Sequence, residues 1–176
     1  SSTGGLIDGA CVLRQTMLDF QPLDVDIDFI GLVRSEADVH PLVLATLKAY
    51  CGFTFRVSKT TVDPMTIGDA TLREAIRKDT VGALELLKLH SLLMVEYELV
   101  LCLDADVMFV GPYDDLLVPY DDIPYRQTPD CNGGIVVYFP RNNGSAHVAA
   151  ILKAFVATPY SPQRGYANYT YGAVMN

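Results

Sequence analysis

Two aspartates separated by one residue form the part of this sequence best suited to chemistry. Asp104-Ala105-Asp106 follows an unbroken apolar run at 99–103. That run predicts a buried strand, so the two carboxylates should stand at its carboxyl end. Because residues i and i+2 of an extended segment point the same way, both can converge on one hard divalent cation, which prefers oxygen ligands. A solvated or capping pair of aspartates at the end of a strand is the alternative. Such a cation neutralises a diphosphate and stabilises it as a leaving group.

The same D-x-D spacing occurs at a second place in the chain, where its interpretation differs. Asp24, Asp26 and Asp28 alternate with Val25 and Ile27 at the amino end of an expected strand. Ligand crevices in open α/β sheets lie at the carboxyl ends of strands, so these aspartates are predicted to form a solvated strand face.

A second group of polar residues precedes another apolar run. Asn132-Gly133-Gly134 leads into the run at 134–139. An amide can both donate and accept hydrogen bonds, and glycines let the backbone approach a ligand closely. Asp130, just before this turn, could accept a hydrogen bond from the same ligand. A plain turn residue before a strand remains the alternative for Asn132.

The expected elements alternate between helices and strands. Helices are predicted at 9–20, 36–50, 70–97 (divided near Gly82) and 145–157, and strands at 25–33, 53–57, 99–103 and 134–139. The segment 111–129, rich in proline and aspartate, is predicted to be mostly loop. This order predicts an α/β/α sandwich around a mostly parallel central sheet.

Length and charge limit the classes of function. The chain has 176 residues and a formal net charge of −8, and half of its residues are apolar. Since domains usually contain about 100–200 residues, we expect residues 1–176 to form one globular domain. The acidic balance argues against nucleic acid as a partner, and no segment is apolar enough to span a membrane.

The cysteines and sequons leave the compartment open between cytosol and Golgi lumen. Since the four cysteines include no C-x-x-C pair, buried free thiols are expected rather than a zinc site. Two N-x-S/T sequons, Asn143-Gly144-Ser145 and Asn168-Tyr169-Thr170, matter only if the chain enters a secretory lumen.

Four motifs in order resemble the glycogenin-like glycosyltransferases of family 8. They are L-K-L-H at 87–90, Y-E-L-V-L-C-L-D-A-D-V at 97–107, D-D-L-L at 114–117 and P-D-C-N-G-G-I-V-V-Y at 129–138. The resemblance implies a GT-A fold of the Rossmann-like type. It also implies transfer of a hexosyl group from a UDP-sugar to a carbohydrate or protein acceptor, with retention of anomeric configuration.

The resemblance also assigns roles to residues. Asp104 and Asp106 would hold Mn²⁺ or Mg²⁺, Asp104 would lie near the ribose, Lys88 would meet the phosphates or the sugar, and Asn132 would touch the donor sugar. Lys88 and Asn132 are therefore the predicted catalytic residues. The predicted donor-binding residues are Lys88, Asp104, Ala105, Asp106, Asp130, Asn132, Gly133 and Gly134. Without the resemblance, Lys88 is interpreted as an exposed helix lysine and His90 as a structural histidine.

Three departures from the family pattern motivate an alternative. The first strand and its uracil-stacking aromatic are missing, with Leu6 near the aromatic's place. The stretch 168–172 lacks the acidic residue of the family's G-D-Q segment, and the chain ends before the C-terminal segment that completes the metal site. A non-catalytic GT-A domain, or a truncated fragment acting as a binding module, is the second hypothesis. A nucleotidyltransferase is disfavoured because no glycine-rich phosphate loop is present.

Overall fold

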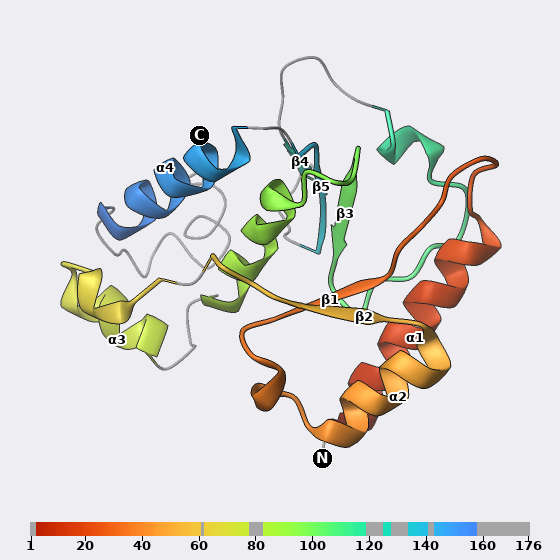
Figure 1. The fold of residues 1–176 in the computed structure, drawn as a ribbon, viewed down its shortest axis with the longest axis horizontal. Helices are drawn as coiled ribbons and strands as arrows, with labels where there is room; N and C mark the ends of the chain where they lie inside the picture. Colours follow the sequence, from red (N-terminus) through yellow and green to blue (C-terminus); the bar gives the residue numbers. More distant parts are fainter. Residues whose placement is uncertain are drawn as a thin grey trace. The chain divides into compact units, whose positions relative to one another are not determined.

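The computed structural model describes residues 3–60, 62–77, 83–118, 125–127, 134–140 and 143–157, and all structural statements below concern these residues. They form a mixed α/β chain, which confirms the expected class (Figure 1). The chain divides into two compact units. Unit 1 comprises Ser1–Ser58 and Leu103–Asp121, and unit 2 comprises Lys59–Cys102 and Asp122–Asn176.

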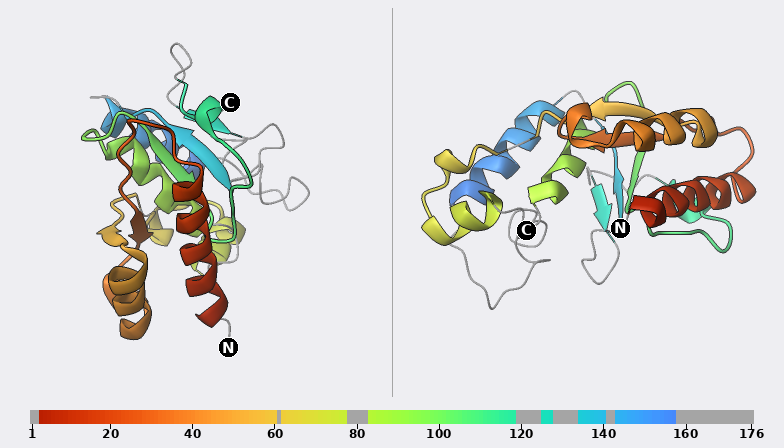
Figure 2. Two further views of the ribbon diagram at one scale, coloured as in Figure 1. Left: turned by 90° about the vertical axis from the view of Figure 1, so that its right-hand side faces the viewer. Right: turned by 90° about the horizontal axis from the view of Figure 1, so that it is seen from below.

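Unit 1 is built on a β–α–β arrangement. Strand β1 (Ile30–Val33) pairs in parallel with β2 (Thr54–Val57), and helix α2 (Pro41–Cys51) connects them. Helix α1 (Thr3–Asp19) packs beside α2 (Figure 2). The predicted strand at 25–33 is thus shorter than expected and begins only at Ile30.

Local signals explain the bounds of α2. The expected helix at 36–50 is interrupted, because a short 3₁₀ turn, η1 (Glu36–Asp38), precedes α2. Pro41 occupies the first turn of α2, where no backbone donor is needed, and the His40 Nδ1 accepts a hydrogen bond from the Leu42 amide at 3.2 Å. Gly52 ends the helix with φ 63°, a left-handed conformation that glycine adopts without steric cost.

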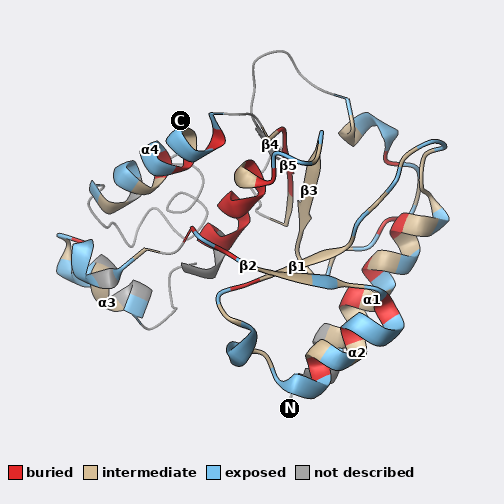
Figure 3. Cartoon of the chain, viewed as in Figure 1, coloured by how far each residue is buried: buried red, intermediate tan, exposed pale blue. Residues whose placement is uncertain are grey.

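The core of unit 1 lies between α1, α2 and β2. Ala10, Val43, Leu47 and Cys51 are buried together, and Phe53 and Phe55 pack against them. Figure 3 shows the buried positions of α1 and α2 as a stripe along each helix. One face of each helix therefore carries the core.

A disulfide joins the two helices of this core. Cys11 in α1 and Cys51 at the end of α2 are bonded, with their Cα atoms 5.5 Å apart. The expectation that all cysteines are free thiols was wrong for this pair, because the helical packing brings together two cysteines 40 residues apart in sequence. Cys102 is a half-buried thiol that is not part of this disulfide.

Unit 2 combines a three-stranded sheet with helices. The strand order is β3–β5–β4, with β3 at Val100–Leu103, β5 at Ile135–Tyr138 and β4 at Tyr125–Gln127. Strands β4 and β5 pair antiparallel. The described strands thus form two small sheets in place of one mostly parallel sheet. Strand β4 and a 3₁₀ turn, η4 (Asp114–Leu116), lie where loop was expected.

The helices of this half differ in type from the prediction. Helix α3 (Ala70–Arg77) and a 3₁₀ helix, η3 (Ala83–Leu93), replace the expected helix at 70–97. A 3₁₀ turn, η2 (Pro64–Thr66), precedes α3. Helix α4 (Gly144–Ala157) follows β5 and contacts η3. No helix among the described residues is long and apolar enough to span a membrane.

The core of unit 2 explains the 3₁₀ geometry of η3. Leu86, Leu89 and Leu92 recur at every third position and are all buried in one cluster. A 3₁₀ helix has 3.0 residues per turn, so this spacing aligns the three side chains along one edge. They pack with Val136 and Tyr138 of β5, and Val148 and Ile151 of α4 complete the cluster.

Candidate functional site

The acidic motif lies where the sequence predicts, directly after β3. Asp104 follows the last residue of the strand, and the Val107 amide donates a hydrogen bond to the Asp104 carbonyl at 3.2 Å. Residues 104–107 therefore form a turn and not the expected extended segment, so extended geometry cannot make the two carboxylates converge. Asp106 is exposed to solvent, whereas Asp104 is half-buried and has an interaction within the chain.

Helix α1 holds this turn from one side. A Cβ atom built on Gly9 would lie 2.5 Å from the Ala105 carbonyl oxygen. The backbone of α1 therefore contacts the backbone of the acidic turn at Gly9, and any larger residue there would force one of the two to move. Ala105 also packs against the buried core of unit 1.

Two further contacts fasten the segment after the turn to α1. The Phe109 amide donates a hydrogen bond to the Thr16 Oγ1 at 3.1 Å. The Tyr113 hydroxyl donates to the Met17 carbonyl at 3.1 Å, and the rings of Phe109 and Tyr113 lie 4.7 Å apart between centroids. Burial, and secondarily the charge of Asp114, raises the pKa of Tyr113, which keeps the phenol protonated as a donor.

These positioning residues were missed in the sequence. Gly9 interrupts the interior of α1, where glycine is about 1 kcal/mol less favourable than alanine. A glycine inside a helical pattern usually has a packing reason, and this was the available signal. No pattern pointed to Thr16 or Tyr113, whose partners lie 93 and 96 residues away in sequence.

Lys88 belongs to η3 in unit 2 and is buried, with 8% of its surface exposed. Its interpretation as an exposed helix lysine was wrong, because η3 is buried on several sides. A buried ammonium group requires a partner, and Lys88 has one within the chain. A role in binding an anion would require Lys88 to exchange that interaction for the ligand.

His90 is structural, as predicted. It is buried, and its Nδ1 accepts a hydrogen bond from the Lys59 amide at 3.2 Å. The neighbouring Thr60 Oγ1 donates to the Leu86 carbonyl at 2.6 Å. Both contacts tie residues 59–60 to η3, so His90 serves the fold.

The second polar group lies mostly outside the described residues. Asp130, Asn132 and Gly133 are not described, and their predicted roles stay predictions. Gly134 is half-buried and immediately precedes β5. Since β5 is the neighbour of β3 in one sheet, the strands that carry the two polar motifs are adjacent.

The other aspartate series is solvated, as predicted. Asp24, Asp26 and Asp28 are all exposed, while Val25 and Ile27 between them are half-buried. The series precedes β1, and Asp24 has φ 65°, a conformation that aspartate tolerates better than most residues.

The acidic turn fits a divalent cation in donor type, though not in donor number. Carboxylate oxygens are the ligands that Mg²⁺ and Mn²⁺ prefer. Within the described ranges, no cluster of three or more His, Cys, Asp or Glu side chains could hold a metal. Asp104 and Asp106 would hold such an ion only with further ligands from water, substrate or the undescribed residues.

No protein-family model matches the chain. No curated protein matches it either.

Proposed function

We propose that this chain is a glycosyltransferase with a GT-A fold of the family 8 type. It would transfer a hexosyl group from a UDP-sugar to a carbohydrate or protein acceptor, with retention of configuration. The observation that carries the proposal is the adjacency of β3 and β5. One of these strands leads into Asp104-Ala105-Asp106 and the other follows Asn132-Gly133-Gly134, so two motifs of the resemblance, remote in sequence, belong to neighbouring strands.

Charge supports a metal-dependent version of this chemistry. The net charge of −8 opposes binding of a nucleoside diphosphate, which is itself anionic. A divalent cation would neutralise the diphosphate and stabilise it as the leaving group. Asp106 is exposed and accessible for this role, and the half-buried Asp104 is held by the turn.

The remaining proposed roles concern positioning. Asn132 would orient the donor sugar through its amide, and Gly133 and Gly134 would allow close approach of the backbone. Asp130 would accept a hydrogen bond from a sugar hydroxyl. Ala105 offers a small side chain between the carboxylates. Catalysis would rest on orientation and charge stabilisation, with Lys88 contributing once its present partner is exchanged for the donor.

A second candidate is a non-catalytic GT-A module that binds a nucleotide or a partner without turnover. Two observations favour it. Lys88 is buried with a partner in place, and the described residues supply fewer than three clustered metal ligands. Release of UDP from a panel of UDP-sugars separates the candidates, since only the enzyme produces UDP.

The proposal is tested by thermal unfolding of the chain with UDP, in the presence and absence of Mn²⁺. Because a ligand of the native state raises the melting temperature by mass action, UDP should stabilise the chain only when Mn²⁺ is present. Asp106→Ala should abolish this shift while leaving the melting temperature of the ligand-free chain unchanged, since the side chain is exposed.

Asp26→Ala is the matched control. It removes an exposed aspartate of the same D-x-D spacing and should keep the full UDP and Mn²⁺ response. An equal response in wild type and Asp106→Ala would show that the metal site is elsewhere. No response in the wild type would refute donor binding by this chain.

A further inference from the structure

The disulfide between Cys11 and Cys51 carries information about the compartment in which the chain folds. Disulfides form and persist in oxidising compartments, whereas cytosolic thiols are kept reduced. Catalytic or regulatory disulfides are typically exposed. Cys51, by contrast, is 3% exposed and packs in the core of unit 1 with Ala10, Val43 and Leu47. The bond is therefore a structural crosslink of the folded chain.

In a secretory compartment, the sequon Asn143-Gly144-Ser145 is an acceptor site for N-linked glycosylation. Asn143 and Ser145, the two residues that define the sequon, are both exposed. Asn143 immediately precedes α4, and its carbonyl accepts the first hydrogen bond of the helix, from the His147 amide at 3.1 Å. The residue is thus fixed through its backbone, and its side chain lies on the surface.

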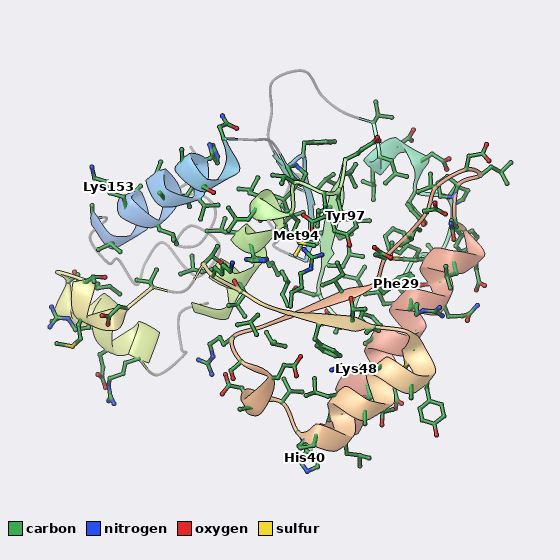
Figure 4. The ribbon with its side chains drawn as sticks, viewed as in Figure 1. Phe29, His40, Lys48, Met94, Tyr97 and Lys153 are labelled. Atoms are coloured by element: carbon green, nitrogen blue, oxygen red, sulfur yellow. A yellow bond between two sulfur atoms is a disulfide. The ribbon has the colours of Figure 1, made fainter. Side chains whose placement is uncertain are left out.

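Among the described residues of unit 2, the packing of α4 leaves Asn143 and Ser145 exposed. Val148 and Ile151 turn one face of the helix toward the core. Ser145 and Lys153 lie on the exposed side, and Figure 4 shows Lys153 projecting away from the ribbon. A glycan on Asn143 would displace no buried side chain.

Helix packing explains why the central residue of the sequon is glycine. A Cβ atom on Gly144 would collide with the Leu92 carbonyl oxygen, so glycine is required where α4 meets η3. No core contact accounts for Asn143 or Ser145 in the same way, because both are exposed.

We infer that the chain folds in an oxidising secretory lumen and carries an N-linked glycan on Asn143. The co-reactant is an oligosaccharide attached to a lipid diphosphate, delivered by the transferring enzyme of the lumen. The Asn143 Nδ2 forms a bond to the anomeric carbon, and the bond from that carbon to the diphosphate oxygen breaks. The electron pair leaves with the lipid diphosphate, and an amide proton passes to a base of the transferring enzyme.

This inference is independent of the proposed glycosyltransferase activity, because it rests on Cys11, Cys51 and the surface at Asn143. Of the two compartments that the sequence leaves open, it selects the lumen. The second sequon, at Asn168, lies outside the described residues.

The experiment is peptide mass spectrometry on the full chain purified from its source cells, lysed in the presence of a thiol-alkylating reagent. We expect Cys11 and Cys51 to be linked and unalkylated. We expect the Asn143 peptide to carry a glycan. Release by peptide N-glycosidase in heavy-oxygen water should leave a labelled aspartate at that position.

Variants expressed in the same cells give the matched controls. Asn143→Gln and Ser145→Ala should lose the glycan on this peptide, Ser145→Thr should keep it, and Asn168→Gln should leave it unchanged. The intact disulfide reports that unit 1 of each variant has folded. An Asn143 peptide without glycan in the wild type overturns the inference, and so does alkylation of both Cys11 and Cys51.

Discussion

Cys11 and Cys51 form a covalent link between residues that lie on different helices. A disulfide stabilises a fold mainly because it restricts the unfolded chain, and longer loops give larger effects. The loop closed here spans 40 residues and contains β1, η1 and most of α2. The link therefore constrains much of unit 1.

Breaking the link should lower the free energy of unfolding. We expect Cys51→Ser to cost about 2–4 kcal/mol, measured as a lower midpoint in urea. Cys102→Ser removes no crosslink and should cost less, although it places a hydroxyl beside the core of unit 2. Reduction of the wild type should bring its midpoint to that of Cys51→Ser. Coincident midpoints of oxidised wild type and Cys51→Ser would show that the link adds no stability.

Individual residues were predictable only where local pattern decides their environment. The position of Asp104 after a strand followed from the apolar run before it, and the structure confirms it. The burial of Lys88 did not follow, because a lysine in a leucine-rich helix usually reaches solvent, whereas η3 is covered on several sides. The pairing of Cys11 with Cys51 depends on helix packing, which spacing alone does not reveal.

At the scale of elements, long periodic segments were predicted best. Helix α4 and strands β2, β3 and β5 begin and end within one residue of their expected bounds. Helices α1 and α2 end within one residue of expectation, but α1 begins six residues earlier than expected and α2 five residues later. The 3₁₀ form of η3 was missed, although a leucine at every third position was its visible signal. Strand β4 was missed because three residues in a proline-rich stretch carry too little pattern.

The most consequential relation between elements is the contact of α1 with the acidic turn. Gly9 allows the helix backbone to approach Ala105, and Thr16 and Met17 bind the chain that follows. The position of Asp104 and Asp106 therefore depends on a helix nearly 90 residues earlier in the sequence.

A pair of glycine substitutions in α1 tests this relation. Gly9→Ala would force the Ala105 carbonyl to move and should lower the free energy of unfolding by about 1–3 kcal/mol. Gly5→Ala, in the same helix, meets no atom within 4 Å and should raise it by up to about 1 kcal/mol. Denaturant unfolding measures both effects.

The same two substitutions in α1 test whether the acidic turn is the binding site. If the acidic turn binds the metal and donor, Gly9→Ala should weaken the Mn²⁺-dependent thermal shift by UDP, while Gly5→Ala should leave it unchanged. Equal responses from a destabilised Gly9→Ala and from wild type would mean that α1 does not position the binding residues.

For the whole molecule, the two units have separate cores. The cluster around Leu47 contains only residues of unit 1, and the cluster around Leu89 contains only residues of unit 2. The sequence predicts one domain over residues 1–176, and this stays a prediction, since two compact units with separate cores can belong to one domain. The small separate sheets agree with this division of the core.

Separate cores predict that the two units respond differently to reduction. The Cys11–Cys51 disulfide lies wholly in unit 1, so a reductant should increase hydrogen exchange of the amides in α1, α2, β1 and β2. The amides of η3, β5 and α4 should keep their protection, because their core contains neither Cys11 nor Cys51. Exchange measured by mass spectrometry with and without reductant makes this comparison within one sample, and Cys51→Ser should reproduce the reduced pattern. Equal loss of protection in both sets of elements would show that the chain unfolds as one cooperative unit, with the disulfide stabilising all of it.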